Sequence, residues 1–206
     1  MSRPKQPRQE PSTRLSVRDL TQDDWPILAA LFGERGACGG CWCMYWRVRG
    51  GVTWEKNKGA SNRRAFRGLV QSGAVHGCLA FAAGEPVGWC NLGPRGDFSK
   101  LQRSRVLRGA GLDEERDNVW AVTCFYIPAA WRRQGIATRL LLHAVDLARR
   151  SRAPALEGYP VRSDTRRVPA AFAWTGVPTL FRRAGFREVT PKGGSRLIYR
   201  KTLGRG

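Results

Sequence analysis

The chain has 206 residues and a mass of 23.0 kDa, which suits a single domain of ordinary size. Hydrophobic residues make up 42% of the sequence, so it can bury a core, and wholesale disorder is excluded. No stretch of about eighteen apolar residues occurs, which excludes a membrane-spanning helix, and we expect no membrane partner. The 36 Lys and Arg residues outnumber the 16 Asp and Glu residues, and the net charge of +20 favours anionic partners.

The basic residues are spread along the whole chain, and 30 of the 36 are Arg. No block of about five like charges occurs, and no basic stripe is interleaved with aromatic residues that would stack on bases. Because basicity alone provides only non-specific affinity for nucleic acids, we expect no specific nucleic-acid partner. A basic nucleic-acid-binding protein stays open as an alternative function.

Residues 1–14 are polar, basic and rich in proline, with no apolar segment behind them. This pattern predicts a flexible basic leader rather than a secretory signal. Six cysteines without an export signal are expected to be reduced thiols, which favours a cytoplasmic location.

Three cysteines, Cys38, Cys41 and Cys43, lie in a loop that is rich in glycine and aromatic residues. Their spacing suggests a metal site at first, but zinc needs four ligands and a matching second pair is absent. His76 or one of two further cysteines would complete a set only if the fold gathered them. We therefore predict no metal, and the role of this loop stays open.

The N-terminal half predicts a strand, two helices and a hairpin. Leu15–Leu20 alternates apolar and polar residues, as a half-buried strand does. A helix is expected over residues 25–32 and a second one over residues 61–72. Short strands over residues 79–83 and 87–92 then form the hairpin.

The C-terminal half contains the strand that we expect at the centre of the sheet. Val119–Ile127 is almost wholly apolar and β-prone, which is typical of a strand buried on both faces. From Gly135 the apolar period becomes helical. Later segments predict a strand over 155–161, a short helix over 178–184 capped by Thr175, and closing strands over 186–189 and 196–203. The order β-α-α-β-β-β-α-β-α-β-β indicates one α/β domain over residues 15–204.

The segment between the central strand and the following helix carries the most specific chemical signal. The strand ends at Ile127, and a turn leads through Arg132, Arg133 and Gly135 into the helix. Backbone amides at such a helix start, together with the positive end of the helix dipole, bind phosphate. Gly135 permits close approach of the backbone, and the two guanidinium groups suit phosphate oxygens.

The motif Arg132-x-x-Gly135-x-Ala137, which follows a Phe-Tyr-Ile strand, resembles the acetyl-CoA-binding motif of the GNAT family of N-acetyltransferases. A second segment, Leu180–Phe186, resembles the closing helix and the Gly-Phe turn of that family. The resemblance covers roughly residues 15–204, and details of the cysteine loop look like a bacterial subgroup. It implies a single GNAT-like α/β domain, with a mixed central sheet of about 6–7 strands, about 4 flanking helices, and a splay between the fourth and fifth strands.

The resemblance also implies an N-acetyltransferase that moves an acetyl group from acetyl-CoA to an amine by direct attack in a ternary complex. The acetyl-CoA would lie in the splay, with its pantetheine arm held by backbone groups of Phe125 and Ile127. Its phosphates would contact the two arginines of the turn and the amides that follow them, which are those of Gln134, Gly135, Ile136, Ala137 and Thr138. The acceptor would be a small-molecule or protein amine, and the protein a monomer or a homodimer.

Two residues that many members of the family carry near the closing helix are missing here. Phe181 stands where relatives have the Tyr that protonates the departing thiolate, and Trp174 stands in place of an Asn. Tyr159 and Glu157 alternate onto one face of their strand, and they are the predicted replacements as acid and base. In the alternative, Tyr159 merely packs, and Glu157 is a solvated strand charge or pairs with an Arg. The missing Tyr also leaves open a third function class, a catalytically silent acyl-CoA-binding GNAT fold.

The aromatic residues of the cysteine loop are the predicted contacts of the acceptor. Trp42 and Trp46, with Tyr45 beside them, would form a wall over the substrate cleft. Such a wall suits a cation, whereas Arg-rich walls suit an acidic substrate, so the charge of the acceptor stays open. Cys124, in the apolar central strand, is expected to be a buried and inert thiol.

Overall fold

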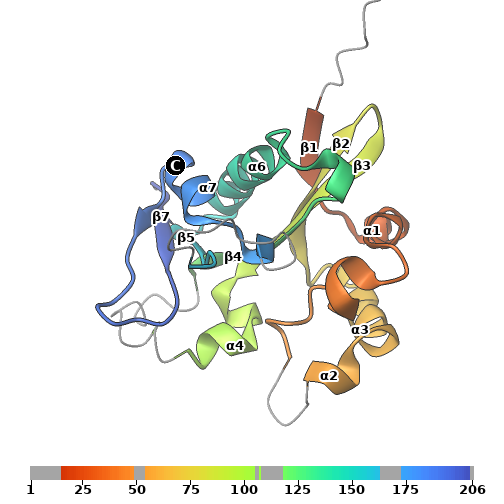
Figure 1. Ribbon diagram of the computed structural model, residues 1–206, viewed down its shortest axis with the longest axis horizontal. Coiled ribbons are helices and arrows are strands. Elements are labelled where there is room, and N and C mark those ends of the chain that lie inside the picture. Colours follow the sequence, from red (N-terminus) through yellow and green to blue (C-terminus); the bar gives the residue numbers. More distant parts are fainter. Residues whose placement is uncertain (1–14, 49–53, 105–106, 108–117, 163–172, 205–206) are drawn as a thin grey trace, which may run out of the picture.

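The computed structural model describes residues 15–48, 54–104, 107, 118–162 and 173–204, and the predicted leader over residues 1–14 lies outside them (Figure 1). The chain forms a seven-stranded sheet in the order β1-β2-β3-β4-β5-β7-β6. The strands are β1 (Leu15–Asp19), β2 (His76–Ala82), β3 (Glu85–Pro94), β4 (Trp120–Tyr126), β5 (Ala155–Gly158), β6 (Arg187–Glu188) and β7 (Tyr199–Thr202). The helices are α1 (Trp25–Phe32), α2 (Trp54–Asn57), α3 (Ala60–Gln71), α4 (Ser99–Gln102), α6 (Ile136–Arg150) and α7 (Pro178–Arg183). In this described part, no helix is both long enough and apolar enough to cross a membrane.

The sheet confirms the predicted α/β architecture. Neighbouring strands are antiparallel except for β4 and β5, which run parallel. Several bounds differ from the prediction; β2, for example, begins at His76 rather than at residue 79. The strand β5 ends at Gly158, three residues short of its expected end. Val177, rather than Thr175, stands at the N-cap of α7, because Thr175 belongs to a short 3-10 turn that ends before the helix begins.

Helices cover both faces of the sheet, and successive side chains of β2 point alternately to one face and to the other. Cys78, Ala80 and Ala82 belong to the hydrophobic cluster that includes α6. Leu79 and Phe81 belong to a second cluster, which includes α1 and α3. Figure 1 shows α6 and α7 on one side of the sheet and α1 and α3 on the other. The period of two is what a strand buried on both faces requires.

The strands β4 and β5 part after a short stretch of pairing. Their parallel ladder runs from Trp120 opposite Leu156 to Val122 opposite Gly158 and then stops, although β4 continues to Tyr126. On its other edge, β4 stays paired with β3 as far as Tyr126. The edge of β4 beyond Val122 is therefore not covered by β5, which confirms the predicted splay between the fourth and fifth strands.

Phe181 of α7 fills the space beside the end of β5. Its ring is fully buried and lies so close to Gly158 that a Cβ atom there would overlap it. The rings of Phe186 and Tyr199 pack around it, with centroids 5.3 and 6.0 Å away. The side chain at this position therefore packs the core next to the splay.

Replacing Gly158 with Ala should lower the free energy of unfolding by about 1–3 kcal/mol, because the added methyl group overlaps the Phe181 ring. In a Phe181→Leu background the same replacement should cost less, since the two sites are in contact. The control is Gly68→Ala on α3, where the space is open and stability should rise by roughly 0.5–1 kcal/mol. Urea denaturation measures each variant, and an equal loss in both backgrounds would contradict the packing.

Candidate active site

A cavity of about 580 Å³, which we call the main cavity, lies beside the open edge of β4. The cysteine loop, residues 36–46, forms one wall, and residues 124–127 at the end of β4 form another. Arg132 and Trp174 complete the lining together with Lys58. The cavity therefore lies where the sheet has lost its backbone pairing.

A second cavity of about 220 Å³, the side cavity, adjoins the first. Tyr45 and Trp174 line both cavities, so the two share a wall. Residues 159–162, after the end of β5, and residues 195–197, before β7, supply most of the remaining lining. The main cavity thus lies on the β4 side of the splay and the side cavity on the β5 side.

The cysteine loop holds residues in unusual backbone conformations. Ala37, Trp42 and Cys43 have φ angles of 65°, 46° and 55°, which residues other than glycine rarely adopt. The Trp42 ring packs in the core between Trp25 and Phe32, with both ring centroids 5.6 Å away. Strained backbone of this kind persists where the surrounding packing holds it, and it is often found at functional sites. The packing of Trp42 therefore holds the loop in place as a wall of the main cavity.

Trp42 and Trp46, which were predicted to form a wall of the substrate cleft, lie in the core. They are only 1% and 3% exposed, and neither lines a cavity. The Trp46 Nε1–H donates to the Thr123 carbonyl at 3.0 Å, on the part of β4 that β5 leaves open. Tyr45 and Trp174 take the positions at the cavity surface instead.

Four thiols line the main cavity, those of Cys38, Cys41, Cys43 and Cys124. Burial raises the pKa of the Cys41 thiol to about 12. A hydrogen bond with Cys43 and burial raise the pKa of the Cys124 thiol, which is buried as expected. Both thiols therefore stay protonated near neutral pH, and a protonated thiol is a poor nucleophile. Among the residues that the structure describes, no group of three or more His, Cys, Asp or Glu residues is placed to hold a metal ion.

The turn before α6, residues 128–135, has the geometry of an anion site. Arg133 and Gly135 have φ angles of 64° and 77°, and Gly135 stands at the N-cap of α6. The first amides of α6, those of residues 136–138, have no acceptor within the helix. Arg133, Gln134 and Gly135 are exposed, and Ala137 and Thr138 are half-buried. The Ile136 side chain is buried, so only its amide can serve a ligand.

Arg132 connects this turn to the main cavity. Its Nε–H donates to the Ile127 carbonyl at 2.9 Å, and its side chain lines the cavity. Phe125 and Ile127, the predicted contacts of a pantetheine arm, line the same cavity. The structure thus brings the predicted cofactor residues together from β4 to α6, and their contacts with a cofactor stay a prediction.

Glu157 and Tyr159 lie together, below the surface. The Tyr159 hydroxyl donates to Glu157 Oε2 at 2.6 Å, and Arg95 Nη1 donates to both carboxylate oxygens at 3.2 Å. Arg200 adds a bond of 3.4 Å. Glu157 is fully buried and lines neither cavity, whereas Tyr159 lines the side cavity. Burial, with the charge of Glu157, raises the pKa of Tyr159 well above its usual range, so the phenol stays protonated.

Residues 20–167, more than half of the chain, match the sequence model of the Acetyltransferase (GNAT) family. The chain belongs to the GNAT acetyltransferase family. The predicted bacterial subgroup within that family stays a prediction. No curated protein matches the sequence.

Solved structures similar to this GNAT chain share its fold. An N-acetyltransferase from Staphylococcus aureus Mu50 is 14% identical, with a TM-score of 0.54 over 93% of this chain and 99% of the other. YncA, a putative acetyltransferase from Salmonella typhimurium with its cofactor acetyl-CoA, is 14% identical, with a TM-score of 0.54 over 93% and 95%. The PaiA N-acetyltransferase from Thermoplasma acidophilum, in complex with coenzyme A, is 16% identical, with a TM-score of 0.51 over 92% and 99%. At these identities the likeness establishes the fold alone.

Several residues at the two cavities of this GNAT domain carry no signal in the sequence. Lys58, Arg162 and Arg196 line the cavities, but each is one of 36 basic residues spread along the chain. Only the fold places them there. Trp174 could be singled out from the sequence, because it stands where the family has an Asn. In the structure it lines both cavities.

Iodoacetamide at mildly alkaline pH should label Cys38 first, because its thiol is exposed. Labelling of Cys41 should be slower by about a hundredfold or more, since a thiol whose pKa is about 12 is rarely a thiolate at that pH. Peptide mass spectrometry over time measures each rate, and Cys38→Ser, which should lose the fast label alone, is the control. Equal rates for Cys38 and Cys41 would contradict the raised pKa of the Cys41 thiol.

Proposed function

We propose that this chain transfers the acetyl group of acetyl-CoA to the nitrogen of an amine while both reactants are bound. The observation that carries the proposal is the main cavity, which extends from the open edge of β4 to Arg132 of the turn before α6 in a GNAT domain. Structures with this fold from Salmonella typhimurium and Sinorhizobium meliloti hold acetyl-CoA, and that from Thermoplasma acidophilum holds coenzyme A. These relatives support the same donor for this chain.

The proposed donor site uses groups that the fold leaves available. The pyrophosphate would bind the amides of residues 136–138 at the positive end of the α6 dipole, with Arg132 and Arg133 adding charge. The pantetheine arm would lie along the open edge of β4, at Phe125 and Ile127, as a peptide strand adds to the edge of a sheet. This arrangement would bring the thioester into the main cavity, at the wall of Tyr45 and Trp174 that the side cavity with Tyr159 shares.

In the proposed reaction, the lone pair of a neutral amine attacks the carbonyl carbon of the thioester. The C–N bond forms, the C–S bond breaks, the nitrogen loses one proton, and the sulfur of coenzyme A gains one. Holding both reactants in one place supplies the orientation that the reaction in water lacks. The raised pKa values of Cys41 and Cys124 favour this direct attack over a covalent acetyl-cysteine, because both thiols stay protonated.

Tyr159 is the proposed proton donor to the departing thiolate. Phe181, at the position where many relatives carry Tyr, has no proton to give and is fully buried. The Tyr159 side chain lines the side cavity, and its raised pKa keeps the phenol protonated. Glu157, the predicted base, lines neither cavity, so we assign it the positioning of the Tyr159 hydroxyl through their 2.6 Å bond. Water would then take the proton of the amine.

Gly135→Glu should abolish binding of acetyl-CoA, because it adds a negative charge at the anion site and strains a backbone whose φ is 77°. Gly84→Glu is the matched control, since Gly84 has a φ of 86° and is equally open, in the turn between β2 and β3. Calorimetry measures the affinity, and acetyl-CoA should raise the melting temperature of the wild type and of the control alone. Wild-type affinity in Gly135→Glu would rule out this turn as the donor site.

Tyr159→Phe should lower kcat about a hundredfold and leave the affinity for acetyl-CoA unchanged, because the hydroxyl that would protonate the thiolate is lost while the ring stays in place. Tyr199→Phe is the matched control, since its hydroxyl donates to Glu188 at 3.1 Å outside both cavities. Turnover is measured with an acceptor found in an amine screen, and thermal unfolding confirms that both variants are folded. Wild-type kcat in Tyr159→Phe would leave water as the donor. Binding of acetyl-CoA without turnover of any amine would favour the silent acyl-CoA-binding fold.

A further inference from the structure

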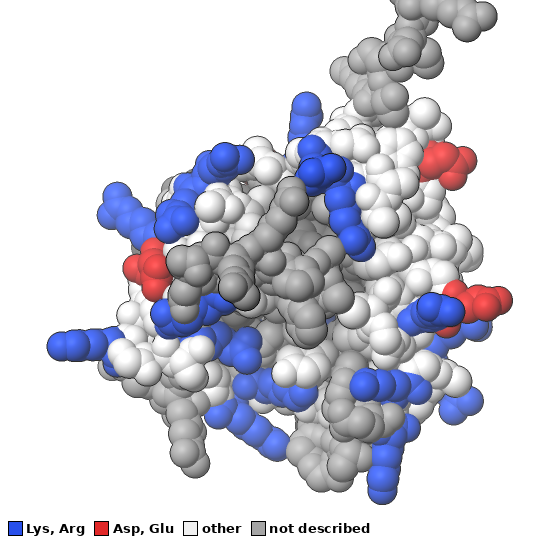
Figure 2. Space-filling view, in the orientation of Figure 1, with Lys and Arg blue, Asp and Glu red and all other residues white. Residues whose placement is uncertain are grey.

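The charges around the two cavities bear on the chemistry of the acceptor, and the inference drawn from them rests on the proposed function. Of the described residues that line either cavity, none is Asp or Glu. Lys58 and Arg132 line the main cavity, and Arg162 and Arg196 line the side cavity. Figure 2 shows a similar imbalance on the viewed face, where the few acidic side chains lie near the edges and the basic ones are spread throughout. A positively charged acceptor would meet like charge in both cavities.

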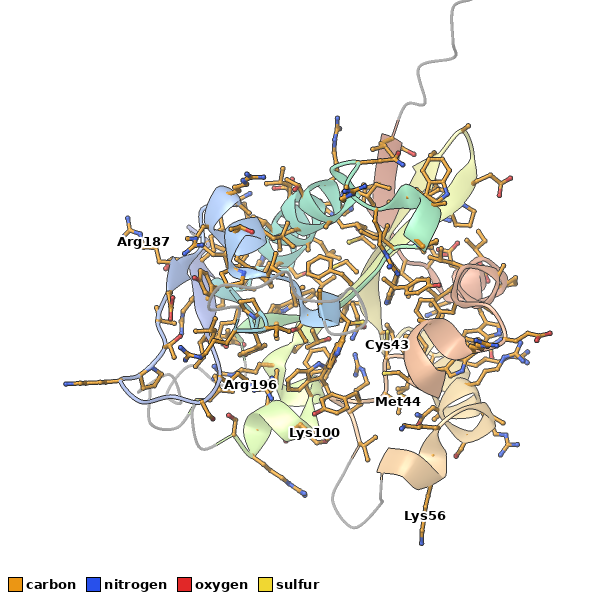
Figure 3. The ribbon with its side chains drawn as sticks, viewed as in Figure 1. Cys43, Met44, Lys56, Lys100, Arg187 and Arg196 are labelled. Atoms are coloured by element: carbon orange, nitrogen blue, oxygen red, sulfur yellow. The ribbon has the colours of Figure 1, made fainter. Side chains whose placement is uncertain are left out.

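Two neighbouring aromatic rings, Tyr45 at the shared wall of the cavities and Trp46 behind it, already carry cations of the protein itself. Arg196 Cζ lies 4.8 Å from the centre of the Trp46 ring, and Lys100 Nζ lies 3.5 Å from the centre of the Tyr45 ring. The centroids of the two rings are 5.2 Å apart, and Figure 3 labels Arg196 and Lys100 in the same lower part of the view. A cationic acceptor at the Tyr45 ring would therefore be repelled by the nearby positive charges.

Two acidic residues on the surrounding elements have basic partners of their own. Glu157 forms ion pairs with Arg95 and Arg200, at 3.2 and 3.4 Å. Asp97 lies 3.6 Å from Arg47. Because these carboxylates are already paired, they do little to offset the positive charge at the cavities.

The donor does not account for the arginines of the side cavity. The groups proposed for the phosphates of acetyl-CoA lie at the turn before α6, and the main cavity is the one that Arg132 lines. Arg162 donates to the Gly194 carbonyl at 3.0 Å, which uses one of its five N–H groups. Arg196 stacks on Trp46, and within the described ranges no carboxylate lies at ion-pair distance from it. Both side chains therefore retain donors for a ligand in the side cavity.

We propose that the acceptor is a small amine that also carries an anionic group, either a carboxylate or a phosphate. Arg196 and Arg162 would bind the anionic group in the side cavity, whose volume of about 220 Å³ suits a small group. The amine would extend past Tyr45 and Trp174 into the main cavity, where the thioester is proposed to lie. The planar guanidinium fork matches the paired oxygens of either anion.

The test compares linear amines that differ only in the group at the far end. An ω-amino carboxylate and an ω-aminoalkyl phosphonate are set against the neutral ω-amino amide and the cationic diamine, at several chain lengths. Release of coenzyme A gives kcat/KM for each amine. We expect kcat/KM for one of the anionic amines to exceed that of the amide and the diamine of equal length by about tenfold or more. The carboxylate and phosphonate arms distinguish the two anions.

Variants of Arg196 test whether this side chain makes the distinction. Arg196→Met removes the charge and keeps an apolar side chain over Trp46, whereas Arg196→Lys keeps the charge. The Met variant should raise KM for the anionic amine by about tenfold or more, and the Lys variant should raise it less. The KM values for acetyl-CoA and for the amide should not change. Arg187→Met is the control, because Arg187 is exposed on β6, lines neither cavity, and points outward in Figure 3.

Any other result contradicts either the anionic acceptor or the proposed acetyltransferase function. Equal kcat/KM for all amines, or a preference for the amide or the diamine, overturns the anionic acceptor and leaves the acetyltransferase proposal intact. An equal change of KM for anionic and neutral amines in Arg196→Met also overturns the anionic acceptor, because it would arise from lost packing over Trp46 rather than from lost charge. Binding of acetyl-CoA without transfer to any of these amines also overturns the anionic acceptor. Absence of both transfer and acetyl-CoA binding overturns the proposed function, and this inference falls with it.

Discussion

A carboxylate buried at the point where β4 and β5 part governs how this sheet is held together. Glu157 lies within the last residue pairs of the parallel ladder, and its oxygens are surrounded by Arg95, Arg200 and Tyr159. Removing one partner of such a buried ion pair typically costs about 3–5 kcal/mol, because a charge is left unpaired in a poorly polar interior. The chain after β3, the end of β5 and β7 must therefore meet in one arrangement, and that arrangement positions the splay.

The arginines around the splay between β4 and β5 have different roles, which depend on where each one lies. Arg95 and Arg200 neutralise a buried carboxylate, so their charge is used within the core. Arg132 lies at the turn before α6, where the proposed donor would place its phosphates. Arg162 and Arg196 line the side cavity, where the proposed acceptor would place its anionic group. The high arginine content alone does not indicate a function, but the position of each arginine in the fold does.

The element order followed from local patterns in the sequence, and the sheet with its splay followed from the resemblance to the GNAT family, whereas the surface of the site followed from neither. The element order, the buried strand β4 and the turn at Gly135 depend on apolar periodicity and on glycine, which act over a few neighbouring residues. The buried Trp42 lies in a loop with positive φ angles at Ala37, Trp42 and Cys43, a backbone conformation that these residue types do not indicate. The side cavity forms only when the ends of β5 and the chain before β7 come together, and residue spacing contains no record of that contact.

Tyr45 and Trp174 line both cavities, so a ligand in either cavity touches the same two rings. Their centroids are 5.1 Å apart in an edge-to-face contact, and close-packed rings in such contact do not move independently. Thermodynamic linkage then relates the binding of a ligand in the main cavity to the binding of a ligand in the side cavity. By whatever factor one ligand changes the affinity for the second, the second changes the affinity for the first by the same factor. Any coupling between an occupant of the main cavity and one of the side cavity would therefore act through Tyr45 and Trp174, the two residues that line both cavities.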